Sequence, residues 1–141
     1  MEAKRKMLLV EDSLADVMLV RLAVEETGVP LEITHLADGE EMIRYLNQNQ
    51  PHDARFILLD LNIPKANGID ILMHKATLPD WKTVPVILYS SSSRPEDVQQ
   101  TIEQGASAYV LKPVDFEQFN RTIQHLAVFW GELNQSALAR N

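Results

Sequence analysis

The chain has 141 residues, enough for one domain around a single buried core and too few for two comfortable ones. Its 20 acidic and 13 basic side chains give a formal net charge of −7, which argues against nucleic acid or an anionic membrane as the main partner. The absence of cysteine excludes a disulfide framework and thiolate chemistry. The first residues resemble neither a signal peptide nor a membrane span, so we expect a cytoplasmic protein.

Five short apolar or alternating runs predict strands, and an amphipathic or capped segment follows each of them. The strands are expected over residues 7–10, 31–36, 56–60, 84–89 and 108–111. The helices are expected over residues 14–27, around 42–46, and over 69–77, 95–105 and 116–137. This alternation predicts right-handed parallel βαβ crossovers. We therefore expect an α/β fold: a three-layer, doubly wound, flavodoxin-like domain with a five-stranded parallel sheet and an extended C-terminal helix.

The predicted strand 56–60 is an apolar run that delivers one carboxylate, Asp60, and Pro64 stops the chain soon afterwards. A run this short and this apolar is typical of a strand that is covered on both faces. Open α/β sheets bind their ligands at the carboxyl ends of such strands. Taken alone, Asp60 could equally be a turn or capping residue.

The residues at the other strand ends favour a functional role for Asp60 over a capping role, because all these ends meet at one edge of a parallel sheet. This edge gathers Glu11 and Asp12, Asp60, Ser90 and Lys112. Three carboxylates in one small volume repel each other unless a cation is present, and hard oxygen ligands favour Mg²⁺ or Mn²⁺. A carboxylate beside that metal, with a lysine and a hydroxyl to receive anionic oxygens, can act as a nucleophile toward phosphorus. Each residue alone also has an ordinary structural explanation as a cap, a polar loop or a solvated strand end.

In this combination the chain resembles a bacterial response-regulator receiver domain of the chemotaxis-regulator type, from about residue 7 to residue 126. The resemblance rests on the segments Leu8–Asp12, Leu58–Pro64 with Asn67-Gly68, Pro85–Ser90 and Gly105–Pro113. It implies that Asp60 accepts a phosphoryl group from a histidine kinase and that Lys112 and Ser90 bind the phosphoryl oxygens. It further implies that Asp12 and Asp60 bind the metal directly, Glu11 through water, and Asn62 through its backbone carbonyl.

The same resemblance implies a switch and a backbone feature near the phosphoacceptor. Ser90 and Tyr109 correspond to the switch pair of the family, and the Lys112–Pro113 bond would be cis. One departure is Ser91, because the family usually has alanine or glycine at this position, and the entrance to the phosphate is then more polar or tighter. We regard the chain as a phosphoacceptor signalling protein that catalyses only its own phosphorylation and dephosphorylation.

The last predicted helix is longer than a receiver requires. Its apolar residues step by threes and fours into a heptad-like seam that continues past the core. We divide the chain into a receiver domain, residues 1–127, and a helical extension, residues 128–141, that forms a homodimer. The alternative is a tail that folds back on its own domain. The predicted dimer surface consists of Phe119, Ile123, Leu126, Phe129, Trp130 and Leu133.

Two short segments, Glu11–Asp16 and Phe129-Trp130, resemble the small regulators that partner phytochrome-type photoreceptor histidine kinases. A generic relay receiver for another kinase is the competing assignment. A phosphohydrolase of the haloacid-dehalogenase type also uses an aspartate nucleophile and Mg²⁺, but it needs an acid two residues later, where Asn62 stands. A nucleotide- or flavin-binding flavodoxin-like protein is a third option, although no glycine-rich phosphate loop follows the first predicted strand.

Overall fold

The computed structural model describes residues 5–133 as one five-stranded parallel sheet between two layers of helices. The strands are β1 (Arg5–Val10), β2 (Leu31–Leu36), β3 (Ala54–Asp60), β4 (Val86–Ser90) and β5 (Ala108–Leu111). The helices are α1 (Leu14–Thr27), α2 (Gly39–Gln48), α3 (Gly68–Ala76), α4 (Pro95–Glu103) and α5 (Phe116–Val128), with two short helices, η1 (Pro79–Trp81) and η2 (Phe129–Leu133). The predicted α/β fold class is confirmed.

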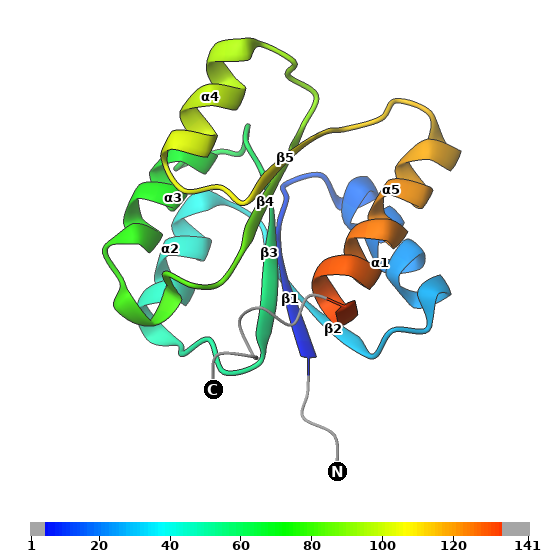
Figure 1. Cartoon of the computed structure of the whole chain (residues 1–141), viewed down its shortest axis with the longest axis horizontal. Helices are drawn as coiled ribbons and strands as arrows, with labels where there is room; N and C mark the ends of the chain where they lie inside the picture. The colour runs from blue at the N-terminus through cyan, green and yellow to red at the C-terminus, as the bar shows by residue number, and fades with distance from the viewer. Residues whose placement is uncertain (1–4, 134–141) are drawn as a thin grey trace.

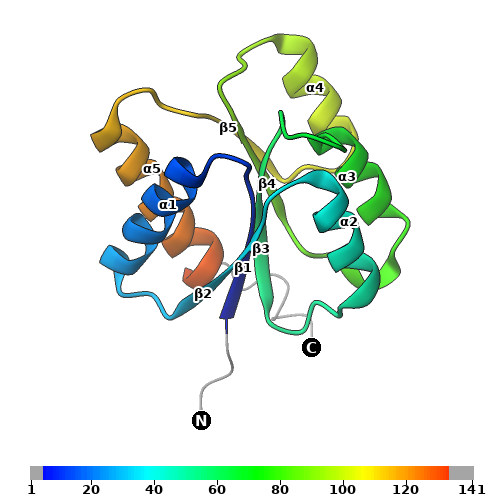
Figure 2. The same cartoon turned by 180° about the vertical axis from the view of Figure 1, so that it is seen from behind.

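The sheet has the order β2-β1-β3-β4-β5, which places β3 at its centre. Helices α1 and α5 cover one face, and α2, α3 and α4 cover the other (Figures 1 and 2). Because both faces are covered, the central strands carry nearly continuous apolar runs. Residues 56–59 of β3 are all fully buried, and their side chains alternate between the two layers of the core.

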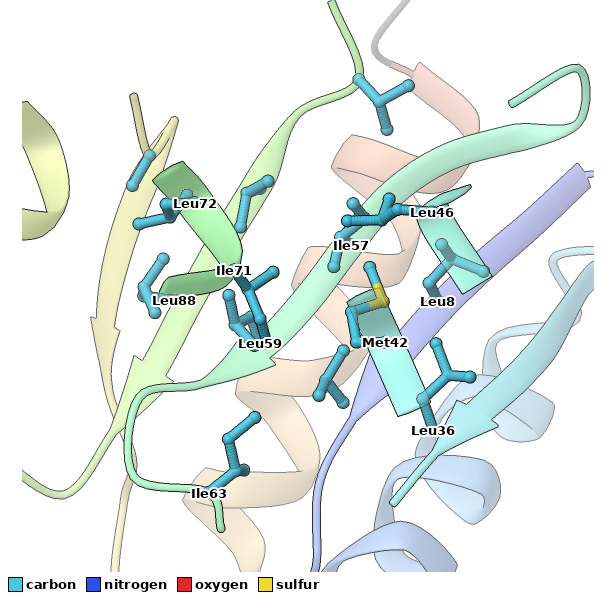
Figure 3. Packing of buried hydrophobic residues seen from close by; sticks show 14 of the residues in the cluster. Leu8, Leu36, Met42, Leu46, Ile57, Leu59, Ile63, Ile71, Leu72 and Leu88 are labelled. Carbon is cyan, nitrogen blue, oxygen red and sulfur yellow. The ribbon is translucent and has the colours of Figure 1, made fainter. Parts of the chain in front are cut away.

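One layer of the core lies between the sheet and helices α2 and α3. Leu8, Ile57, Leu59 and Leu88 of the sheet meet Met42 of α2 in this layer (Figure 3). The opposite layer joins β1, β3 and β4 to α1 and α5, and Phe56 and Leu58 belong to it. The side chains of residues 56–59 are therefore anchored alternately in the two layers, which fixes the point where the strand ends.

Local capping sets the helix ends close to the predicted positions. Ser13 accepts a hydrogen bond from the backbone N–H of Asp16 and starts α1, and Asp115 caps α5 in the same way. Gly28 ends α1 with a left-handed conformation, at a φ of 75°. Asn67 caps α3 through a capping box and has a negative φ, and the positive φ of the loop before it falls at Lys65.

Helix α4 is the least firmly packed of the five longer helices, as its thin apolar content predicts. Its one buried side chain is that of Thr101, and Ile102 is 47% exposed. Few buried apolar contacts mean that local opening of a helix has a low free energy. The helix that follows the Ser90–Ser93 loop is thus the easiest of these helices to displace.

The C-terminal segment differs from the expected long amphipathic helix. The regular α-helix ends at Val128, and the chain continues as a single π-helical segment, η2, whose wider turn interrupts the heptad-like spacing. Gly131 lies against Leu31 and Phe56, so that a side chain at residue 131 would touch both. This segment therefore folds back on its own domain. The continuation of the seam through Ala137 lies outside the described residues.

The predicted dimer surface is partly wrong. Phe119 and Ile123 are 4% and 2% exposed and belong to the core between the sheet and helices α1 and α5. Leu126 and Trp130 pack against the same core, and Phe129 is the exposed aromatic residue, at 52%. The apolar stripe of α5 is buried within the domain, because its side chains pack against the sheet and α1. The side chain of Leu133 is outside the description.

Among residues 5–133, no helix is both long and apolar enough to span a bilayer.

Lys75, on α3, is the one lysine buried in the described part of the chain, at 6% exposure. It lines a cavity of about 320 Å³ together with Leu72, Ala76 and Gly105, and its ammonium donates to the carbonyl of Lys82 at 3.4 Å. Burial lowers the pKa of Lys75 to about 8 from its ordinary value of 10.5. Between these values the unfolded chain binds more protons than the folded chain, so stability rises with pH in this window.

We expect Lys75→Met to raise the free energy of unfolding at pH 7 by on the order of 1 kcal/mol, since the variant buries no charge. The variant should also lose the part of the stability increase between pH 8 and pH 10.5 that this lysine contributes. Urea unfolding across this pH range measures both effects, with the exposed Lys82→Met as the control. A pH dependence identical in the two variants would contradict the assignment.

Candidate functional site

The site forms where four neighbouring strands end at one edge of the sheet. Strand β1 delivers Glu11 and Asp12, β3 ends in Asp60, β4 ends in Ser90, and β5 is followed by Lys112. The parallel register aligns these ends, since Val10 pairs with Leu59, Asp60 with Tyr89, and Ser90 with Leu111. The side chains of Glu11, Asp60 and Lys112 meet there, as predicted, with Asp12 beside them.

Three carboxyl groups at this edge could hold a metal ion. Oxygen atoms of Glu11, Asp12 and Asp60 all lie within 4.8 Å of one another. Glu11 and Asp60 are 1% and 8% exposed, whereas Asp12 is open to solvent. Hard carboxylate oxygens with one open side suit a small divalent cation that retains some of its water. This donor set fits the predicted metal site.

Lys112 supplies the positive charge that the acidic cluster needs. Its ammonium nitrogen lies 3.0 Å from Asp16 Oδ2, 3.2 Å from Glu11 Oε1 and 3.3 Å from Asp60 Oδ2. Burial alone would lower the pKa of Lys112, but the hydrogen bond to Asp16 and the charges of Asp60 and Glu11 outweigh it and raise that pKa. The lysine is thus a permanent cation within reach of the phosphoacceptor candidate.

Glu11 is held from two sides. The hydroxyl of Tyr89 donates to its Oε1, and the backbone N–H of Ser13 donates to its Oε2 at 3.1 Å. Burial raises the pKa of the Glu11 carboxyl, and the hydrogen bond from Tyr89 opposes this shift. The pKa of Tyr89 is itself raised, by burial first and then by the Glu11 charge. The tyrosine therefore remains a hydrogen-bond donor, and the Lys112 ammonium lies 4.5 Å from the centre of its ring.

Asp60 presents its two oxygens to different partners. Oδ1 accepts the backbone N–H of Asn62 at 3.0 Å, and Oδ2 faces Lys112. The bond from Asn62 comes from the first residues of the loop between β3 and α3, so the loop orients the carboxylate. The ligand role predicted for the Asn62 carbonyl stays a prediction.

The predicted switch residues Ser90 and Tyr109 share one neighbour, Ser92. Ser90 is fully buried, and its hydroxyl accepts the backbone N–H of Ser92 at 3.1 Å. The hydroxyl of the half-buried Tyr109 donates to the carbonyl of Ser92 at 2.8 Å. The Ser92 hydroxyl in turn donates to Asp97, in the first turn of α4. A displacement at Ser90 can therefore reach both β5 and α4 through a single residue.

The expectation of a cis bond before Pro113 is wrong for this structure. Within residues 5–133 no peptide bond is cis. The trans form is the intrinsically favoured one before proline, by about 0.5–1 kcal/mol. In this structure the Lys112 ammonium lies 3.3 Å from Asp60 Oδ2 with a trans bond before Pro113.

Two members of the site, Asp16 and Tyr89, were missed as functional residues in the sequence. Asp16 lies within the predicted helix 14–27, and Tyr89 lies at the end of the predicted strand 84–89. The sequence feature that could have identified Asp16 as a site residue is its position four residues, about one helical turn, after Asp12. Nothing in the sequence showed that the Tyr89 hydroxyl would face Glu11, because Tyr89 lies 78 positions away along the chain.

Known proteins with similar sequences share this arrangement of elements. The family described as the response regulator receiver domain matches residues 7–124. Response regulator Rcp1 of Synechocystis sp. is 32% identical over 129 residues, which covers 89% of this chain and 88% of Rcp1. The chain thus has relatives that it matches over most of their length.

Three solved structures are similar to the whole domain. The Mn²⁺-bound form of Rcp1 has a TM-score of 0.84 and 30% sequence identity. The match covers 92% of this chain and 96% of the Rcp1 chain. The phosphorylated cyanobacterial phytochrome response regulator RcpA has a TM-score of 0.86 at 30% identity, covering 94% and 97%. The bacteriophytochrome response regulator RtBRR has a TM-score of 0.72 at 35% identity, covering 94% and 83%. With its sheet order, its acidic edge and this family match, the chain belongs to the response regulator receiver family.

Proposed function

We propose that Asp60 is the phosphoacceptor of a two-component phosphorelay and takes its phosphoryl group from a histidine kinase. The observation that carries this proposal is the placement of Asp60 Oδ2 3.3 Å from the Lys112 ammonium, within the oxygen cluster of Glu11 and Asp12. A buried carboxylate with a cation on one side and metal-binding oxygens on the other suits nucleophilic attack on phosphorus.

In the proposed reaction a bond forms between an Asp60 oxygen and phosphorus while the bond from phosphorus to the donor histidine nitrogen breaks. Lys112 and the Ser90 hydroxyl receive the phosphoryl oxygens. Glu11, Asp12 and Asp60, with the carbonyl of Asn62, would hold Mg²⁺ or Mn²⁺. When bound, the ion supplies positive charge that offsets the negative charge on the phosphoryl oxygens.

The proposed output is a change at the Ser90–Ser93 loop. A phosphoryl group adds roughly −1.5 to −2 charge and new acceptor oxygens. Movement of Ser90 toward them would withdraw its hydroxyl from the Ser92 N–H and disturb the bond from Tyr109 to the Ser92 carbonyl. Because Ser92 also contacts Asp97, the loosely packed α4 would shift with the loop.

The proposed partner is a phytochrome-type histidine kinase, and a generic relay with another kinase is the alternative. The similarity to the cyanobacterial phytochrome response regulator RcpA and to the bacteriophytochrome response regulator RtBRR supports the first choice. Any donor histidine must approach Asp60 past the helices that begin next to the site, including α1 and α5. Large apolar side chains are exposed there: Leu14 and Met18 on α1 are 70% and 65% exposed, and Phe116 at the start of α5 is 57% exposed.

The proposed activity is self-modification rather than turnover of a substrate. A haloacid-dehalogenase-type phosphohydrolase needs an acid two residues after its nucleophile, and Asn62 cannot protonate a leaving group. We further propose a cytoplasmic location and a homodimer. Phe129, at 52% exposure, is the predicted contact residue that remains most available for the dimer.

Treatment with acetyl phosphate and Mg²⁺ should add the mass of one phosphoryl group to the native protein, as read by intact mass spectrometry. Asp60→Asn should abolish this gain, because an amide is not a nucleophile toward phosphorus. Asp53→Asn, at the opposite end of β3, is the matched control and should behave like the native chain. A gain that survives in Asp60→Asn would refute the assignment of the phosphoacceptor, and steady turnover of a phosphomonoester would favour the hydrolase.

Mg²⁺ alone should raise the melting temperature, because the ion relieves repulsion within the acidic cluster. At a metal concentration about 100-fold above Kd, the gain in unfolding free energy is about 2.7 kcal/mol. Asp12→Asn should weaken binding and reduce the shift at the same concentration, whereas the exposed Asp80→Asn should not. Scanning calorimetry with and without Mg²⁺ measures this, and an undiminished shift in Asp12→Asn would exclude Asp12 as a ligand.

Met18→Gln should lower kcat/KM for phosphotransfer from a phytochrome-type kinase by about fivefold, as expected for the loss of roughly 1 kcal/mol of apolar contact. The reaction with acetyl phosphate should not change, because the small donor needs no docking surface. Met73→Gln on α3, which removes a methionine of similar exposure from the other face, is the control. Equal effects of the two variants, or faster transfer from unrelated kinases, would argue against this surface or this partner.

A further inference from the structure

The shortest ion pair in the site involves a carboxylate outside the metal-binding group. Lys112 lies 3.0 Å from Asp16, closer than to Glu11 or Asp60. The oxygen cluster that could hold a metal comprises Glu11, Asp12 and Asp60, and Asp16 is not part of it. The Asp16 carboxylate can therefore pair with Lys112 without also binding the metal ion.

The position of Asp16 is fixed by the start of helix α1. Its backbone N–H donates to the Ser13 hydroxyl at 3.2 Å, and the Ser13 N–H donates to Glu11 Oε2. Helix α1 is anchored one residue later by Val17, which is 5% exposed and belongs to the core shared with α5. None of these contacts uses the side chain of Asp16, which points its carboxylate at Lys112.

Lys112, in contrast, has little support from its own segment. It follows a four-residue strand at the sheet edge, between Leu111, which is 53% exposed, and the fully exposed Val114. Its long stem has many rotamers, and its ammonium is fixed by the carboxylates that it meets. A divalent cation shared by Glu11 and Asp60 would reduce the attraction of both groups for the lysine and would also repel it.

We propose that Asp16 is a positioning residue that holds the Lys112 ammonium at the phosphoacceptor edge while a divalent cation occupies the other carboxylates. This inference rests on the proposed function of Asp60. Asp16 keeps its full charge for Lys112, so the lysine stays beside Asp60 and is already in place when the phosphoryl group arrives. The alternative role for Asp16 is that of an ordinary acidic residue in the first turn of a helix, where it would act on the helix dipole alone.

The test uses the isosteric variant Asp16→Asn with Glu41→Gln as its matched control. Glu41 is also in the first turn of its helix, α2, three residues after the cap Asp38, so it reproduces the dipole effect away from the site. The first readout is the ¹⁵N NMR signal of the Lys112 ammonium. We expect this signal to be protected in the native protein with and without Mg²⁺, and to be lost in Asp16→Asn when Mg²⁺ is added.

The second readout is the rate of phosphorylation by acetyl phosphate at saturating Mg²⁺. We expect Asp16→Asn to be about tenfold slower than the native chain and Asp16→Glu to recover part of the rate. In a Lys112→Ala background, Asp16→Asn should have no further effect, since the two residues act as a unit. Glu41→Gln should match the native rate and signal.

A protected Lys112 signal in Mg²⁺-loaded Asp16→Asn would overturn the inference, as would a rate loss that persists in the Lys112→Ala background. Phosphorylation of the Asp60→Asn variant, or none of the native chain, would instead refute the proposed function. The NMR readout distinguishes the two failures, because it needs neither a phosphodonor nor turnover.

Discussion

Burial of β3 on both faces is the constraint on which the site depends. Residues 56–59 are anchored alternately in two core layers, so the strand cannot slide or rotate, and Asp60 must stand at the edge of the sheet with 8% exposure. A carboxylate in that place loses most of its water and requires partners. Lys112, which follows β5, and the backbone N–H of Asn62, in the loop after β3, supply these partners. The core thus dictates both where the proposed nucleophile Asp60 stands and what must surround it.

Strand β4 supplies two neighbouring residues, Tyr89 and Ser90, that orient other groups of the site. Tyr89 alternates with Ser90 along β4, so its side chain lies in the core between the sheet and helices α1 and α5, where its hydroxyl holds Glu11. Ser90 belongs to the opposite side and bonds the loop that begins at Ser91. One strand therefore holds both Glu11, a candidate metal ligand, and the loop of the proposed switch, and a mutation that tilts β4 would disturb both.

Much of this arrangement follows from the sequence, because a parallel sheet brings all its strand ends to one edge. The alternation of elements was enough to place Glu11, Asp12, Asp60, Ser90 and Lys112 together. The role of Asp16 depends on the direction of a lysine side chain, which no pattern encodes. Burial of Phe119 and Ile123 was misread because an apolar stripe does not reveal whether it covers a sheet or a partner. The π-helical turn after Val128 was likewise invisible, since wide turns have no clear sequence signature.

Four carboxyl groups, those of Glu11, Asp12, Asp16 and Asp60, lie at this edge, and all but Asp12 form an ion pair with the ammonium of Lys112. The local potential is therefore negative, and an anionic phosphodonor is repelled as it approaches. A divalent cation bound there would offset most of this negative charge, so under the proposed function its binding would come before the approach of the donor. Under the proposed function, the availability of divalent cations would set a threshold for phosphorylation. Salt would raise this threshold, because it screens the attraction between the cation and the carboxylates.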